Sequence, residues 1–130
     1  MAYIVLDSSA ILCLLRGEPR SIEVRQILEK AAEKDIPVHM TEVDYAEIKY
    51  SVIQKEGRDE WNRIEALTLS ALIKFHTIDR NLADLAAEFR LFNNCTFEQS
   101  LTQALIKKLK CRTYITDIKI SIPVNFKKHI

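Results

Sequence analysis

The sequence predicts an α/β fold, a three-layer α/β/α sandwich built on a parallel sheet of about five strands. Short apolar runs alternate with longer stretches in which apolar residues recur every three or four positions. Strands that alternate with helices are typical of parallel βαβ units, whose helices cover both faces of the sheet. The chain has 130 residues and no visible repeat or linker, so we expect a single domain over residues 1–130.

The predicted strands are short and mostly apolar. The first run, Tyr3-Ile4-Val5-Leu6, is wholly apolar, which suits a central strand that is buried on both faces. Each of the others is followed by a polar residue or a turn. The five predicted strands are 3–6, 36–40, 72–78, 113–116 and 120–126.

Six amphipathic segments predict the helices. Asp7 and the serines after it can cap the first helix, and Thr41 can begin the third. Thr96 and Gln99 have the spacing of a capping box at the start of the last helix. The six predicted helices are 10–15, 21–34, 41–55, 59–70, 81–92 and 97–109.

The composition excludes several classes of protein. Nineteen basic residues stand against 18 acidic ones, so binding of an anionic polymer must depend on local patches. Only two glycines occur, which excludes phosphate-binding loops that need clustered glycines. Cys13, Cys95 and Cys111 share no metal-binding or redox spacing, which predicts buried free thiols in the reducing cytoplasm. Asp7 and Arg16 interrupt the apolar start, so we expect neither a membrane span nor a signal peptide.

Acidic residues fall where parallel strands end, the edge at which such sheets bind ligands. Asp7 follows the first strand and Asp117 the fourth, while Glu47 lies two turns into the helix after the second strand. Glu98 and Gln99 open the last helix. Repulsion among these carboxylates is best relieved by a hard cation with oxygen ligands, Mg²⁺ or Mn²⁺, which can activate a water against a phosphodiester.

Each of these residues also has a structural explanation. Asp7 could simply cap a helix, Glu47 could be solvated, and Asp117 could begin a turn. Glu98 is favoured at a helix N-terminus, and Gln99 could serve the capping box alone. We expect the remaining acids near these segments to be exposed and without a chemical role: Asp44, Asp79 and Asp84.

Three motifs resemble those of PIN domains, especially the VapC-type toxins of prokaryotic toxin–antitoxin pairs. They are I-V-L-D-S-S-A-I-L at 4–12, Y-A-E-I at 45–48 and Y-I-T-D at 114–117, and the likeness extends to L-A-D-L-A-A-E-F-R at 82–90 and I-P-V at 122–124. The resemblance implies a Mg²⁺- or Mn²⁺-dependent endoribonuclease that hydrolyses RNA in one step with a metal-bound water. It also implies a cytoplasmic homodimer that is silenced by an antitoxin protein.

The resemblance assigns roles to residues. Asp7, Glu47 and Asp117 match acids that hold the metal and carry catalysis, and Ser9 and Thr116 match hydroxyls that orient these ligands. Two positions depart from the family pattern. T-F-E-Q at 96–99 stands in place of S-L-A-D, so the usual acid is Gln99, with Glu98 one residue earlier and about 100° around the helix. The usual glycine before the last acid is missing as well.

The missing acid leaves two functions open. Either Glu98 or Gln99 completes the metal site of a weakened nuclease, or the domain is degenerate and binds RNA or a protein without cutting. Five cations near the C-terminus could contact phosphates in either case, although a solvated helix face also explains them: Lys107, Lys108, Lys110, Arg112 and Lys119. A dehalogenase-like phosphatase also has an acid after its first strand, but it needs a second Asp two positions later, where this chain has Ser9.

Overall fold

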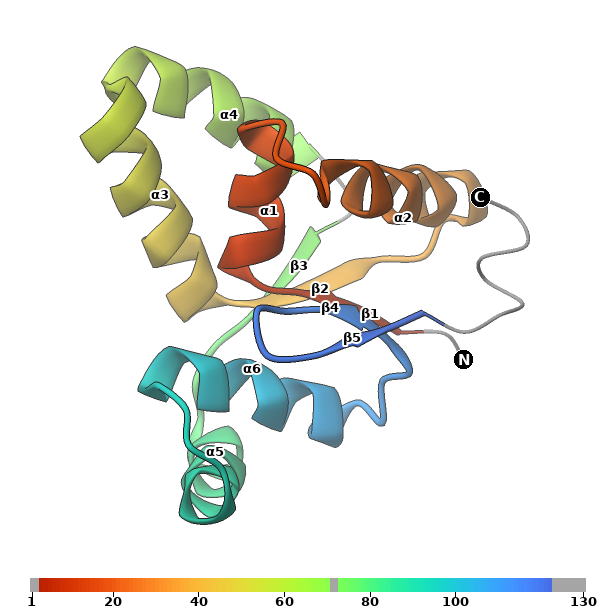
Figure 1. Cartoon of the computed structure of the whole chain (residues 1–130), viewed down its shortest axis with the longest axis vertical. Helices are drawn as coiled ribbons and strands as arrows, with labels where there is room; N and C mark the ends of the chain where they lie inside the picture. The colour runs from red at the N-terminus through yellow and green to blue at the C-terminus, as the bar shows by residue number, and fades with distance from the viewer. Residues whose placement is uncertain (1–2, 71–72, 123–130) are drawn as a thin grey trace.

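The computed structural model describes residues 3–70 and 73–122, except for the side chains of 67–70 (Figure 1). Strands and helices alternate as the apolar pattern predicts. The side chain of Leu67, the start of the predicted third strand, the end of the fifth and the tail of the chain lie outside the described part. The elements, in chain order, are β1 Ile4–Leu6, α1 Ser8–Leu15, α2 Ser21–Lys34, β2 Val38–Thr41, α3 Glu42–Glu56, α4 Arg58–Ser70, β3 Ile73–His76, α5 Arg80–Phe92, α6 Phe97–Lys108, β4 Thr113–Ile115 and β5 Ile120–Ser121.

The sheet has five strands in the order β3-β2-β1-β4-β5. Strands β1 to β4 are parallel, as expected, but β5 pairs antiparallel with β4. The reason is the short connection of four residues, 116–119, because a parallel pairing needs a crossover of a dozen residues or more. The chain leaves β1 on one side to form β2 and β3 and returns on the other side as β4, so β1 and β4 flank the point where the strand order reverses.

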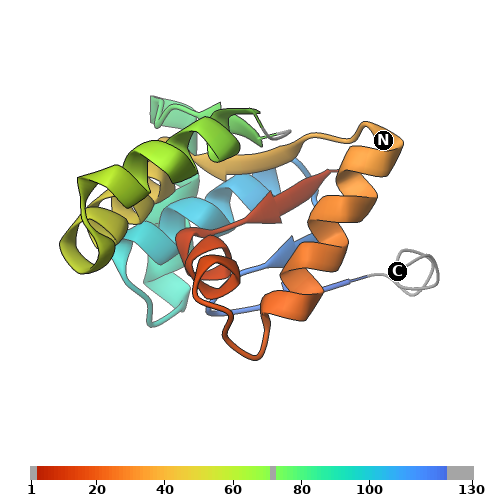
Figure 2. The ribbon, with the colours of Figure 1, turned by 90° about the horizontal axis from the view of Figure 1, so that it is seen from above.

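Helices cover both faces of the sheet and form two apolar cores (Figures 1 and 2). Helices α1 to α4 pack on one face against residues such as Leu6 and Met40. Helices α5 and α6 pack on the other face, where Val5 meets Leu101 and Leu105. Adjacent strand residues therefore point into different cores, as the pleat requires, and the predicted three-layer sandwich is confirmed.

Side-chain caps fix where four helices begin. Asp7, Thr41, Asp79 and Thr96 each accept a hydrogen bond from the backbone N–H three residues on. At α6 the capping box is complete, since the Gln99 side chain also accepts from the Thr96 N–H. Three of these helices, α1, α3 and α6, begin beside the same edge of the sheet, and this places their N-termini close together.

The cysteines are reduced, but they are less buried than the sequence suggested. Cys111 is buried, whereas Cys13 and Cys95 are half-buried. Cys13 lies near the end of α1, and Cys95 lies in the connection between α5 and α6. None of the helices in the described part combines the length and apolarity needed to cross a membrane.

Two histidines meet on the α5–α6 face of the sheet. His39 on β2 is buried, and its Nδ1 lies 2.8 Å from Nε2 of His76 on β3. Within the described part, Nε2 of His39 has no partner. Burial, the neighbouring His76 and Lys74 lower the pKa of His39 from 6.5 to about 4. A proton on His39 would add a buried N–H with nothing to accept it.

The His39 pair predicts acid sensitivity. His39 takes up a proton near pH 6.5 in the unfolded chain and near pH 4 in the folded chain. The stability that the neutral, buried His39 contributes is therefore complete above pH 6.5 and is lost as the pH falls towards 4. By pH 5 the loss should be about 2 kcal/mol. Urea unfolding at pH 7.5 and pH 5 should show it in the wild type. The His39→Phe variant should lose less on acidification, and an equal loss in both proteins would contradict the assignment.

Candidate active site

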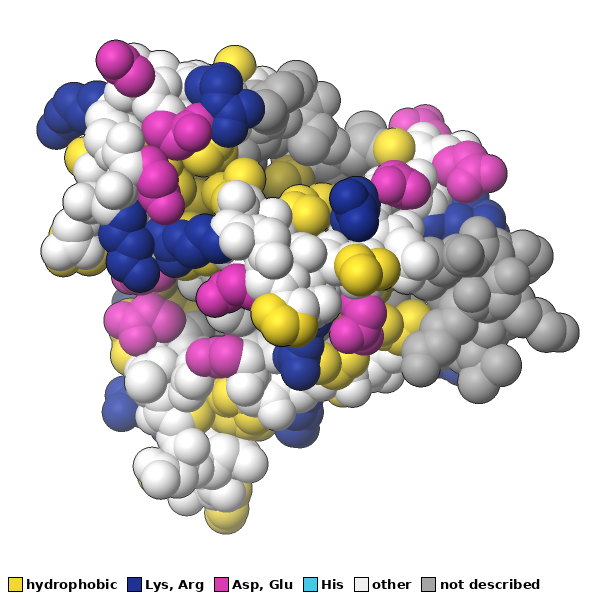
Figure 3. Space-filling view, turned by 45° about the horizontal axis from the view of Figure 1, so that its top comes forward, with side chains coloured by type: hydrophobic (Ala, Val, Ile, Leu, Met, Phe, Trp, Pro, Cys, Tyr) yellow, Lys and Arg dark blue, Asp and Glu magenta, His cyan; other side chains and the backbone are white. Residues whose placement is uncertain are grey.

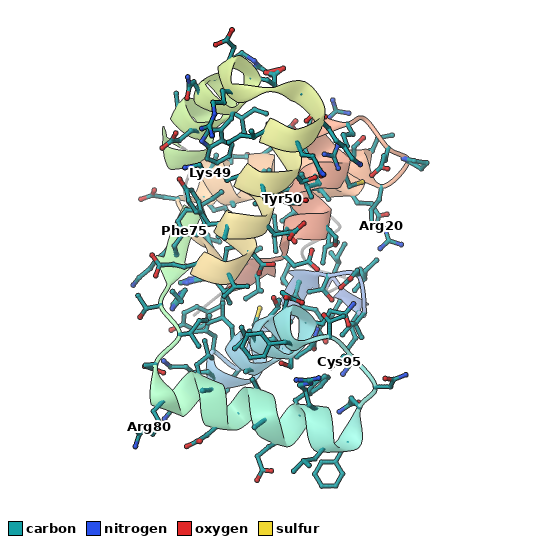
Figure 4. All side chains as sticks on the ribbon, turned by 90° about the vertical axis from the view of Figure 1, so that its left-hand side faces the viewer. Arg20, Lys49, Tyr50, Phe75, Arg80 and Cys95 are labelled. Carbon is teal, nitrogen blue, oxygen red and sulfur yellow. The ribbon has the colours of Figure 1, made fainter. Side chains whose placement is uncertain are left out.

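The candidate site lies at the carboxyl edge of the sheet, where the strand order reverses. Asp7 directly follows β1, and Asp117 lies two residues after β4, the neighbouring strand. The N-termini of α1, α3 and α6 meet at this edge (Figure 1) and face the viewer in Figure 4. Each helix N-terminus carries a partial positive charge, so this edge favours anionic side chains and ligands.

A pocket of about 180 Å³ opens at this edge. Acidic side chains lie on both sides of a hollow at the left of Figure 3. All five residues predicted as metal ligands line the pocket, together with Asp44, which was not predicted. Its lining residues are Asp7, Ser8, Asp44, Glu47, Thr96, Glu98, Gln99, Thr102 and Asp117.

Asp7 is buried and held by three donors. Its Oδ1 accepts from the Ser9 hydroxyl at 2.6 Å and from the Ala10 N–H at 2.9 Å, and its Oδ2 accepts from the Asp117 N–H at 3.0 Å. Burial nevertheless raises the pKa of Asp7 from 3.8 to about 6, and the nearby charge of Asp44 adds to the rise. The hydrogen bonds oppose burial without cancelling it, so the negative charge at Asp7 lacks full compensation.

The prediction that Asp44 is an exposed surface acid is wrong. Its side chain is 3% exposed. Its Oδ1 accepts from the Ser8 N–H at 3.1 Å, and its Oδ2 accepts from the hydroxyls of Thr41 at 3.0 Å and Thr102 at 2.9 Å. Burial raises the pKa of Asp44 as well. One carboxylate thus joins the starts of α1 and α3 to the first turns of α6.

A sequence signal for Asp44 existed. It stands three residues before Glu47, so the two side chains project from the same side of α3. It is also the third residue after the cap Thr41, a position whose side chain often turns back towards the cap. Thr102 had no comparable signal, because its contact with Asp44 spans 58 residues of sequence.

The side-chain amide of Gln99 forms hydrogen bonds with two neighbours. Its Oε1 accepts from the Thr96 N–H at 2.8 Å, and its Nε2 donates to Oδ2 of Asp117 at 2.7 Å. The amide therefore closes the capping box and holds Asp117 at the same time. Glu98, its neighbour, is exposed and also lines the pocket.

The predicted hydroxyls lie behind the pocket lining. Ser9 reaches the site through its bond to Asp7. Thr116 is buried, and its Oγ1 organises the turn between β4 and β5 by donating to the Lys119 carbonyl at 2.9 Å and accepting from the Lys119 N–H at 2.9 Å. That turn carries Asp117, so Thr116 acts on the pocket by fixing the backbone beside it.

The hydrogen bonds close a ring around the pocket. The ring runs from Asp44 to Ser8, through the peptide link to Asp7, and on to Asp117. It continues from Asp117 to Gln99 and returns along α6 through Thr102 to Asp44. Every segment that carries a pocket acid is therefore tied to the next.

The chemistry of the lining suits a divalent cation with oxygen ligands. Five carboxylates line one small pocket, and burial leaves the charge of Asp7 poorly compensated. In the part of the chain that the structure describes, no three acidic, histidine or cysteine side chains already lie close enough together for a metal site. Glu47 and Glu98 are exposed, which leaves their side chains room to change rotamer.

The pocket predicts opposite effects of two substitutions at Asp44. Asp44→Asn should raise the free energy of unfolding at pH 7, because an amide keeps the contacts to Ser8, Thr41 and Thr102 while removing a buried charge. The raised pKa of Asp44 means that ionisation weakens the fold, so the gain should shrink as the pH falls towards 4. Asp44→Leu, of similar size, should cost about 1–3 kcal/mol for each polar group left unpaired. Urea unfolding measures both, and destabilisation by Asp44→Asn would contradict the account.

Comparisons with known proteins agree with this architecture. Three solved structures share the fold. VapC20 of Mycobacterium tuberculosis, described as a sarcin–ricin loop cleaving toxin, is 14% identical with a TM-score of 0.67, and the match covers 97% of this chain and 94% of that chain. A toxin–antitoxin complex from Klebsiella pneumoniae is 16% identical with a TM-score of 0.64 and coverage of 87% and 84%, and VapBC2 of Rickettsia felis bound to a promoter DNA fragment is 15% identical with a TM-score of 0.71 and coverage of 97% and 92%. A comparison with curated proteins finds no match. The family model of the PIN domain matches residues 4–107, and the chain therefore belongs to the PIN domain family.

Proposed function

We propose that this PIN domain is a divalent-metal-dependent endoribonuclease of the VapC toxin type. The observation that carries the proposal is the pair formed by Asp7 and Asp117 at the strand-order reversal, in a pocket also lined by Glu47 and Glu98. Acids brought together from four separate segments are costly to a fold unless their charge is used. The likeness of the fold to VapC20, described as a sarcin–ricin loop cleaving toxin, supports RNA as the substrate class.

Asp7, Glu47 and Asp117 would hold a Mg²⁺ or Mn²⁺ ion, with Glu98 or the Gln99 amide beside them. Such an ion supplies an activated water and neutralises charge on the phosphodiester. The protein's own contribution is orientation. Ser9 fixes one oxygen of Asp7, and the Asp117 N–H fixes the other. The three helix N-termini around the pocket favour an anionic phosphate there.

The second candidate is a PIN domain that binds RNA or protein without cutting. Gln99 favours it, because both ends of its amide already bond to neighbours, Thr96 and Asp117. An amide brings no negative charge, so affinity for a divalent cation should be lower than with a carboxylate at this position. Metal dependence separates the candidates, since a nuclease needs the ion and a binding module does not.

We propose further that the domain acts in the cytoplasm, as a homodimer that an antitoxin silences. Two of the similar structures are a toxin–antitoxin complex from Klebsiella pneumoniae and VapBC2 of Rickettsia felis, which supports a partner protein of this kind. The chain has exposed apolar side chains on α2 and α3 that could serve such contacts: Ile22 and Tyr50. Size measurement of the purified chain, with and without its partner, tests the assembly.

Metal-dependent cleavage is the first test of the nuclease. With Mn²⁺ or Mg²⁺ the wild type should cut a mixed RNA pool, and EDTA should stop it. Asp7→Asn should reduce the rate by more than the roughly 10- to 100-fold lost when a residue that only supports a metal ligand is removed. Asp84→Asn makes the same change at an exposed position of α5 and should have no effect. If a folded, metal-supplied protein leaves the pool intact, the non-cleaving candidate replaces the nuclease.

A substitution at Gln99 tests whether the absence of a carboxylate at this position limits metal binding. Gln99→Glu keeps the acceptor for the Thr96 N–H but sets a carboxylate against Asp117, so the metal-free variant should melt at a lower temperature than the wild type. Added Mn²⁺ should raise its melting temperature more than that of the wild type, and its cleavage should be faster. Gln54→Glu adds the same charge at an exposed position of α3 and is the control. An equal Mn²⁺ shift in the wild type and in both variants would show that Gln99 does not limit metal binding.

A further inference from the structure

A second hollow lies between α5, α6 and the end of the sheet. It has a volume of about 510 Å³, and we call it the α5–α6 groove. Six of its lining residues carry the argument below, three aromatic, two cationic and one amide: Phe89, Phe92, Tyr114, Lys107, Lys119 and Gln103. None of them lines the acidic pocket.

Aromatic rings line the groove, and one of them is open to solvent. The Phe92 side chain is 84% exposed, although it is large and apolar. Phe89 is half-buried, and Nζ of Lys119 lies 5.7 Å from the centre of its ring. The exposed ring of Phe92 can stack on a flat partner such as a nucleobase, and the ammonium of Lys119 beside Phe89 can contact a phosphate.

The charge of the groove complements an anionic polymer. Lys107 and Lys119 line it against one acid, Glu88, whereas the neighbouring pocket is lined by acids alone among its charged residues. Of the other cations near the C-terminus, Lys108 forms a salt bridge outside the groove, with its Nζ 3.9 Å from Oδ2 of Asp79. Two lysines in an aromatic groove can contact phosphates of a single strand.

One turn joins the groove to the acidic pocket. Asp117 and Lys119 lie two residues apart in the turn that Thr116 organises, and they line the pocket and the groove respectively. Gln103, in the groove, donates to Oγ1 of Thr116 at 3.3 Å, so the side of the turn that faces the groove is also fixed. A strand that lies in the groove therefore leads to the site of cleavage.

We propose that the α5–α6 groove binds single-stranded RNA next to the scissile bond. An unpaired base stacks on Phe92, and the backbone phosphates contact Lys107 and Lys119. The inference rests on the proposed ribonuclease function and adds the surface of the chain that holds the RNA strand, the α5–α6 groove. In duplex RNA the base faces are stacked on each other and cannot reach Phe92.

The test separates binding from cleavage. Binding of a short, unstructured, fluorescein-labelled RNA is measured by anisotropy in EDTA, where nothing is cut. Phe92→Ala should weaken binding at least about 5-fold, the loss of one base–aromatic stack. Leu91→Ala is the matched control, because Leu91 is the adjacent residue of α5, is 73% exposed and does not line the groove. Lys119→Gln should reduce the slope of log affinity against log salt by about 0.7.

The outcomes distinguish this inference from the proposed function. If Phe92→Ala and Leu91→Ala bind RNA with equal affinity, the proposed role of the groove is wrong, whether or not the wild type cuts RNA. Binding equally tight to duplex RNA would overturn it too. If Phe92→Ala leaves RNA binding unchanged and abolishes self-association in sedimentation, the groove is a contact between copies of the chain. Weaker binding in Phe92→Ala alone supports the groove, and a wild type that binds without cutting rejects only the nuclease.

Discussion

The carboxylate of Asp44 is the contact on which the arrangement of the site depends. It accepts hydrogen bonds from Ser8, Thr41 and Thr102, which belong to three elements far apart in sequence. A buried charge is tolerated when several donors surround it, and those donors then cannot move apart without leaving it unpaired. Asp7 and Glu47 lie on two of the elements that Asp44 joins, so their positions follow from a residue with no necessary contact to substrate.

Gln99 connects two sides of the site without a cation. Two carboxylates side by side, at 99 and 117, would repel each other in the absence of a cation. The amide instead donates to Asp117 and accepts from Thr96, which closes the ring of hydrogen bonds without any ion. The amide thus orders the site but carries no negative charge, whereas a carboxylate at position 99 would add one. Stability without metal and affinity for metal therefore oppose each other at position 99.

The fold followed from the sequence because its signals are local. Apolar runs marked the strands, and Thr96 with Gln99 marked the start of α6, three residues apart. Asp7 and Asp117 could also be placed, since a residue that follows a parallel strand lies at a known edge. Asp44 could not be assigned correctly, because its burial depends on Thr102 of a distant helix. The direction of β5 was missed for another reason, as strand propensity does not encode pairing direction and only the short turn decides it.

The net charge of +1 conceals two surfaces of opposite character. Acids from four segments gather in the pocket, and lysines lie in the groove on the other side of one turn. The separation agrees with the two proposed roles, because a cation site and a phosphate-binding surface need opposite charge and would neutralise each other if their residues were mixed. The Thr116–Lys119 turn keeps them apart and in register, with Asp117 lining one surface and Lys119 the other. A change in this turn should therefore disturb binding and chemistry together, whereas a change in Phe92 or Glu47 should disturb one of them.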